Sequence, residues 1–135
     1  MFAMKVRYLG DFQTECTHES GARIVTHAPK DVQGGGGAFS PTDLMAVSVG
    51  ACMLTLISMM GKKLGIELKG MTAEVEKHMV LQPKRKISKM ILRIRSSYSP
   101  SKEEQEKLEK AALDCPVHLS LHPDIQVELD FVWGL

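Results

Sequence analysis

Aromatic residues, cysteines and excess charge of either sign are all scarce in this sequence. Its 135 residues include one Trp, two Tyr, four Phe and three Cys, and the formal net charge is only +1. So small a charge gives no reason to expect a nucleic acid or an anionic membrane as a partner. An odd number of cysteines without the spacing of a secreted scaffold argues against a disulfide framework. Residues 1–7 carry no apolar signal core, so we expect a cytoplasmic protein.

One long run, residues 44–60, carries no charged side chain. It is slightly short for a membrane span, and Ser48, Gly50, Thr55 and Ser58 interrupt it. Since it lies in mid-chain, we interpret it as a helix buried on nearly all sides. A single sheet in so small a chain covers only one face of such a helix, and a second subunit is the simplest source of further cover.

Local signals predict one domain over residues 1–135 with an α+β fold. Ser40 with Asp43, and Ser101 with Glu104, have the spacing of helix capping boxes, and Gly61 can close the first helix. We expect a mostly antiparallel sheet and one central helix. The predicted strands span residues 4–9, 12–18, 22–27, 71–81, 87–98 and 125–133, and the predicted helices begin at 41, 101 and 117.

The cysteines are the main candidates for chemistry. Cys52 lies inside the apolar run, where it is either a small buried hydrophobe or a thiol facing a shielded pocket. Cys115 precedes Pro116; if Pro116 takes the first helical position, the helix N-terminus should lower the pKa of the Cys115 thiol. Cys16 lies in an alternating strand, and we interpret it as incidental.

Two other motifs, a metal site and a phosphate-binding loop, have weaker support in the sequence. Cys115, His118 and His122, with Cys52, could supply metal ligands, but a metal site more often shows two closely spaced ligand pairs. The glycines at 34–37 are not followed by the Gly-Lys-Ser/Thr of a phosphate-binding loop. We therefore expect neither a metal nor an organic cofactor.

Three segments together resemble the OsmC/Ohr family, the osmotically induced and organic hydroperoxide resistance proteins. They are residues 40–44 (SPTDL), 49–52 (VGAC) and 114–117 (DCPV). The resemblance covers nearly the whole chain and implies an OsmC-like fold, formed as an intertwined α+β homodimer. It also implies thiol-dependent reduction of peroxides, with Cys52 as the peroxidatic thiol and Cys115 as the resolving thiol.

The chain departs from the family pattern at two points. Thr42 stands where organic hydroperoxide resistance proteins place a Glu, and the Arg that activates the thiol has no clear counterpart; Arg23 is the first candidate and Lys30 the second. We therefore expect an OsmC-like peroxidase that reduces organic hydroperoxides and is recycled by an external dithiol. The alternative is a non-catalytic protein on the same scaffold that binds a small apolar ligand or a redox partner.

Overall fold

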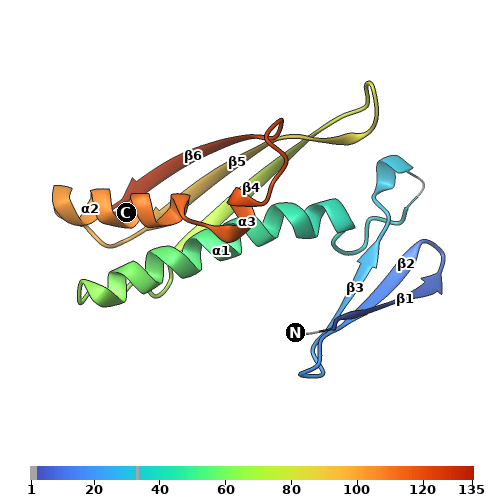
Figure 1. Cartoon of the computed structure of the whole chain (residues 1–135), viewed down its shortest axis with the longest axis horizontal. Coiled ribbons are helices and arrows are strands. Elements are labelled where there is room, and N and C mark those ends of the chain that lie inside the picture. The colour runs from blue at the N-terminus through green and yellow to red at the C-terminus, as the bar shows by residue number, and fades with distance from the viewer. Residues whose placement is uncertain (1–2, 33) are drawn as a thin grey trace. The chain divides into compact units, whose positions relative to one another are not determined.

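The computed structural model describes residues 3–32 and 34–135, and the chain forms two compact units, Met1–Met45 and Ala46–Leu135. Figure 1 gives the elements in chain order. The mixed α+β class predicted from the sequence is confirmed. The strands form two separate three-stranded sheets, one in each unit.

The first unit contains an antiparallel sheet in the order β1-β2-β3. Its strands are β1 (Lys5–Gly10), β2 (Gln13–Thr17) and β3 (Arg23–His27), followed by the short 3-10 helix η1 (Lys30–Val32). Because side chains alternate along a strand, the register places Val6, Cys16 and Ile24 on one face. Val6 is 68% exposed and Ile24 47% exposed, so this apolar face is uncovered within the chain.

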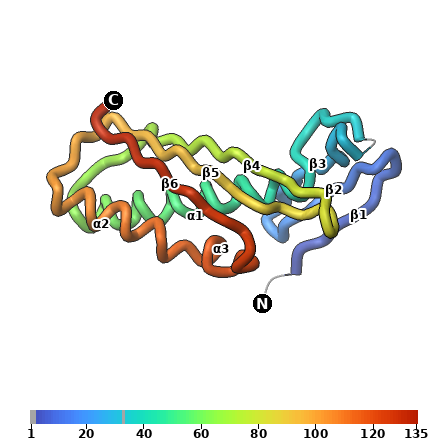
Figure 2. Tube along the Cα trace, turned by 90° about the horizontal axis from the view of Figure 1, so that it is seen from above, coloured from blue at the N-terminus to red at the C-terminus, as the bar shows by residue number. Residues whose placement is uncertain are grey.

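The second unit packs most of α1 (Pro41–Lys63) on one face of a β4-β5-β6 sheet. The sheet strands are β4 (Thr72–Val80), β5 (Lys86–Ser96) and β6 (Gln126–Trp133). The β4–β5 pair is antiparallel, whereas β5 and β6 are parallel. A parallel pair needs a long crossover, which here consists of α2 (Lys102–Leu113) and α3 (Pro116–Leu119). Figure 2 shows this crossover lying along the strands on the α1 side.

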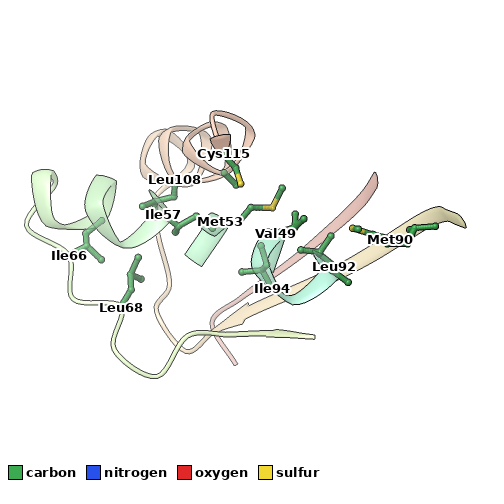
Figure 3. Packing of buried hydrophobic residues seen from close by; sticks show 13 residues of the cluster. Val49, Met53, Ile57, Ile66, Leu68, Met90, Leu92, Ile94, Leu108 and Cys115 are labelled. Carbon is green, nitrogen blue, oxygen red and sulfur yellow. The ribbon is translucent and has the colours of Figure 1, made fainter. Parts of the chain in front are cut away.

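The core forms where these elements meet (Figure 3). Val49, Met53 and Ile57 recur every four residues along one side of α1, and all three are fully buried. They face the inward side chains of β5, which alternate along the strand as Met90, Leu92 and Ile94. Leu108 of α2 is also fully buried.

The predicted capping boxes are both present. The Ser101 hydroxyl accepts from the Glu104 backbone N–H at 3.1 Å, and the Glu104 carboxylate accepts from the Ser101 N–H at 2.9 Å. Ser40 and Asp43 form the same reciprocal pair at the start of α1, at 3.1 and 2.9 Å. These bonds satisfy amide groups that the first turn of a helix leaves unpaired.

The predicted end of α1 at Gly61 is wrong. The helix continues to Lys63, and Gly65, with a φ of 73°, closes it. The Gly61 carbonyl then accepts from the Ile66 N–H at 2.8 Å, and the Lys62 carbonyl from the Gly65 N–H at 3.1 Å. Gly61 instead allows close packing, because an added Cβ would lie 2.9 Å from Leu68 Cδ1.

Part of α1 is exposed in the single chain, so its predicted burial on nearly all sides depends on a second subunit and stays a prediction. Val47 is 42% exposed and Met59 56% exposed. By length and composition α1 could also cross a membrane, but the core helix of a soluble protein satisfies the same criterion. The Val49–Met53–Ile57 stripe packed in the core favours that second interpretation.

The packing on β5 predicts a large stability effect at Leu92. We expect Leu92→Ala to lower the free energy of unfolding by about 2–5 kcal/mol, because it removes a fully buried side chain and leaves a cavity. Leu81→Ala, at an exposed position between β4 and β5, is the matched control and should change it by about 0.5 kcal/mol or less. Urea unfolding of both variants tests this; equal losses would contradict the assigned core.

Candidate functional site

Cys52 lies on a flank of α1, beside the buried stripe. It directly precedes the fully buried Met53, and its side chain is partly buried against the core cluster. Successive helix positions are about 100° apart, so Cys52 is turned away from the sheet while Met53 faces it. The α1–β5 packing therefore holds this thiol on a rigid element at the margin of the core.

Cys115 lies at the start of α3, as predicted. It is the N-cap residue, Pro116 occupies the first helical turn, and the Cys115 side chain is fully buried. The His118 backbone N–H donates to Cys115 Sγ at 3.3 Å. Proline suits this position because its fixed φ matches the helix and it has no N–H to satisfy. The local sequence thus fixes the Cys115 sulfur at the helix N-terminus.

The fold brings the Cys52 and Cys115 thiols together as hydrogen-bonding neighbours. Both belong to the second unit, and both pack with the core that Figure 3 shows, where Cys115 is labelled. No spacing rule places residues 52 and 115 side by side. The packing of the α2–α3 crossover on α1 does so.

The expectation of a lowered pKa at Cys115 is wrong. Burial is the main influence and raises the pKa of the Cys115 thiol, and the hydrogen bond with Cys52 raises it further. The donated N–H bonds of His118 and Val117 act in the opposite direction but do not prevail. Cys115 therefore stays protonated near neutral pH, and its S–H can donate to a Cys52 thiolate.

The third cysteine and the candidate cations belong to the first unit. Cys16 lies in β2 between Val6 and Ile24 in register. Arg23 lies at the start of β3, where its Nη1 is 3.9 Å from Glu15 Oε2 and its side chain is 66% exposed. The aliphatic part of the Lys30 side chain packs over Gly36, since an added Cβ there would lie 2.6 Å from Lys30 Cγ.

Thr42 and Asp43 take part in the start of α1. The Thr42 hydroxyl lies 3.2 Å from the Ser40 hydroxyl. Asp43 Oδ2 accepts from the Ser40 N–H in the capping box. Asp43, the carboxylate nearest to the position where the family places a Glu, therefore has a structural role in this cap.

The metal interpretation finds no support in the geometry. Within residues 3–32 and 34–135, no three His, Cys, Asp or Glu side chains are grouped so as to hold a metal ion. His118 acts through its backbone N–H instead, a contribution that the sequence analysis missed. The N-cap spacing of Cys115 and His118 was the available signal, because an N-cap side chain accepts from an amide two or three residues later.

A model of the OsmC-like protein family matches residues 34–130. The chain belongs to the OsmC-like family. No curated protein matches the chain. Among solved structures, a Psychrobacter arcticus protein shares 41% identity over 97% of this chain and 96% of its own, with a TM-score of 0.92. Its provisional name refers to osmotic stress induction and a detoxification response.

Two more distant structures share the fold. An organic hydroperoxide resistance protein OsmC of Legionella pneumophila is 20% identical over 98% of this chain and 96% of its own, with a TM-score of 0.78. The organic hydroperoxide resistance protein OhrB of Bacillus subtilis is 20% identical over 96% of this chain and 98% of its own, with a TM-score of 0.71. The OsmC-like fold predicted from the resemblance is therefore confirmed.

The contact between the two thiols predicts a pKa response. We expect Cys52→Ala to lower the pKa of Cys115 relative to wild type, because the hydrogen bond and charge that favour the Cys115 thiol form are removed. The rate of iodoacetamide labelling of Cys115 against pH, followed by peptide mass spectrometry, measures this shift. Cys16→Ser is the control and should leave the curve unchanged. An unchanged curve in Cys52→Ala would mean that the thiols do not interact.

Proposed function

We propose that this OsmC-like protein is a cytoplasmic thiol peroxidase that reduces organic hydroperoxides through Cys52 and Cys115. The observation that carries the proposal is the contact of a partly buried thiol with a fully buried thiol whose pKa is raised. A peroxidase of this kind needs one thiolate to attack and a second thiol held close enough to condense with the resulting sulfenic acid. Family membership supports the same chemistry.

In the proposed cycle the Cys52 thiolate attacks the terminal oxygen of the hydroperoxide. An S–O bond forms as the O–O bond breaks, and the alkoxide takes a proton from solvent to leave as an alcohol. Cys52 is thereby oxidised by two electrons to a sulfenic acid. The Cys115 sulfur then displaces the hydroxyl of the sulfenic acid as water, forming the Cys52–Cys115 disulfide. An external dithiol restores both thiols by exchange and becomes a disulfide itself.

We further propose that the active form is a homodimer. The exposed apolar face of the β1-β2-β3 sheet includes Met4, Val6, Tyr8 and Ile24, and a side of α1 that includes Val47 is also exposed. Soluble monomers rarely leave such extended apolar faces open to water. A second copy of the chain is the simplest cover for them.

The alternative function, a non-catalytic binding protein on the same scaffold, rests on the departures from the family pattern. Thr42 supplies no carboxylate, and Arg23 is exposed and lies at ion-pair distance from Glu15. Turnover of cumene hydroperoxide with a dithiol separates the two functions. A binding protein would consume no peroxide beyond the stoichiometric oxidation of its thiols.

The proposed roles of Cys52 and Cys115 predict different results when each is replaced by serine. Cys52→Ser should abolish peroxide consumption, since the attacking sulfur is lost. Cys115→Ser should consume one equivalent and leave a sulfenic acid that dimedone traps, because nothing resolves it. Cys16→Ser, the matched control, should turn over as wild type does. Peptide mapping that found Cys16 in the disulfide would overturn the assignment.

A cation that activates Cys52 should be detectable in the rate of Cys52 alkylation measured against pH. If Arg23 is that cation, Arg23→Ala should raise the pKa of Cys52 and slow peroxide reduction by roughly 10- to 100-fold. Lys30→Ala tests the second candidate in the same way. Arg7→Ala is the matched control, since Arg7 also pairs with Glu15, at 3.3 Å. If all four proteins gave the same curve, neither cation would activate the thiol and the binding function would be favoured.

Dimer formation has a direct test. Light scattering at micromolar concentration should give twice the mass of the 14.9 kDa chain. Val6→Asp, on the exposed sheet face, should shift the protein toward the monomer, because a buried carboxylate without a partner is strongly unfavourable. Lys5→Asp, on the opposite face of β1, is the control. A folded monomer in the wild type would refute the dimer.

A further inference from the structure

The imidazole ring of His118 has a nitrogen that is buried without a hydrogen-bond partner. His118 Nδ1 is shielded from water and bonds to no residue that the structure describes. Buried polar atoms in native proteins are nearly always hydrogen-bonded, so an unpartnered one calls for an explanation, and a catalytic role is a recognised one. The chemistry described above uses the backbone N–H of His118 but gives its side chain no task.

The histidine four residues later has a different environment. His122 Nδ1 accepts a hydrogen bond from the Asp124 backbone N–H at 3.0 Å, and the His122 side chain is 67% exposed. That ring nitrogen therefore has a local partner, and the rest of the ring is open to water. The unpartnered nitrogen is thus particular to His118 and is not shared by both histidines of this segment. His122 offers a matched control for it.

The position of His118 in α3 places its side chain close to Cys115. Cys115 is the N-cap residue and His118 the third helical residue, the two positions whose side chains meet in a capping box. Side chains three residues apart on a helix are neighbours, with Cβ atoms about 5–6 Å apart. The His118 ring does not serve as a cap, because the Cys115 N–H donates to the Ala112 carbonyl at 3.3 Å. The ring is therefore near the Cys115 sulfur and has no structural bond at Nδ1.

Cys115 needs a proton acceptor if it is to form a disulfide with Cys52. The thiolate is the form that attacks sulfur, whereas burial raises the pKa of the Cys115 thiol and keeps it protonated near neutral pH. The backbone N–H groups of Val117 and His118 that bond to Cys115 are donors and cannot take its proton. A neutral imidazole can, because one of its two nitrogens carries no hydrogen and is an acceptor.

We propose that His118 Nδ1 accepts the Cys115 proton when the Cys115 sulfur attacks the oxidised sulfur of Cys52. The proposal rests on the thiol pair of the proposed function and concerns its second step. The Cys115 S–H bond breaks as the S–S bond forms, and the S–O bond of the Cys52 sulfenic acid breaks. The leaving hydroxide takes the proton from the imidazolium and departs as water, so His118 returns to its neutral form. The residue as a whole is only half-buried, so its ring can also exchange protons with solvent.

Reaction with dithionitrobenzoate tests this proton transfer without any peroxide. In the Cys16→Ser protein the reagent should first modify Cys52, which is partly buried, and not Cys115, which is fully buried. Cys115 then attacks the mixed disulfide on Cys52 and releases a second, coloured thionitrobenzoate, and its proton goes to His118. His118→Gln keeps hydrogen-bonding groups but cannot accept a proton near neutral pH. We expect it to slow the second release by about 100-fold or more and to leave the first release unchanged.

The matched control is His122→Gln, which should release both equivalents as its parent does. His118→Ala should also be slow, and added N-methylimidazole should restore its second release in proportion to concentration, because that base accepts a proton but has no N–H to donate. Such rescue separates proton transfer from packing, even if a variant has a lowered melting temperature. The proposal would be overturned by a parental second release in His118→Gln, by an equal loss in His122→Gln, or by rescue no greater than in the parent.

Turnover of cumene hydroperoxide separates this inference from the proposed function. In a working peroxidase, dimedone should trap more Cys52 sulfenic acid in His118→Gln than in wild type, because the resolving step is slow. If peroxide is consumed but His118→Gln releases thionitrobenzoate at the parental rate, the His118 proposal fails and the peroxidase remains. If no peroxide is consumed but His118→Gln is slow and N-methylimidazole rescues His118→Ala, the His118 proposal stands and the peroxidase fails.

Discussion

At Gly50 the backbone of α1 approaches the sheet so closely that an added Cβ would lie 2.9 Å from Val75 Cγ2. This contact lets Val49 and Met53 enter the core opposite Leu92, where all three side chains are fully buried. Burial of each such side chain contributes about 1.5–3 kcal/mol, so the helix is held firmly in one rotational setting. That setting turns Cys52 to a flank, toward the α2–α3 crossover. The position of the Cys52 thiol and its contact with Cys115 both depend on it.

Two effects compete at Cys115, and their outcome bears on the proposed roles of the two thiols. The helix N-terminus favours a thiolate, while complete burial favours the neutral thiol. Burial prevails, and the hydrogen bond with Cys52 acts in the same direction. Reasoning from the helix position alone ranks Cys115 as the more reactive thiol, whereas the resemblance to the OsmC/Ohr family implies the reverse. The buried environment agrees with the roles that the resemblance implies, because a thiol with a raised pKa is less often present as the attacking thiolate near neutral pH.

Features set by neighbouring residues could be predicted from the sequence. The Ser101–Glu104 box, the Cys115–Pro116 helix start and the strand over residues 87–98 that forms β5 were all predicted and are present. Features set by tertiary contacts could not be predicted in this way. Glycine often ends a helix, but Gly61 lies inside α1, where the absence of a side chain lets Leu68 pack closely against the helix. The division into two sheets was not predicted, and the parallel β5–β6 pair and the meeting of residues 52 and 115 depend on how the α2–α3 crossover packs. The resemblance supplied the thiol pairing, which local patterns do not contain.

The second unit of one chain leaves two requirements of the proposed site unmet. The side of α1 that carries Val47 is apolar and exposed. A Cys52 thiolate at the margin of an aliphatic core also needs stabilisation beyond one S–H donor, since desolvation disfavours the charged form. Covering α1 with a second subunit would exclude water from the thiol and so raise the cost of leaving its charge unbalanced. If Cys52 attacks as a thiolate, as proposed, a dimer that buries α1 should also bring a cation close to it. In the proposed peroxidase, dimer formation and activation of the thiol are thus parts of the same problem.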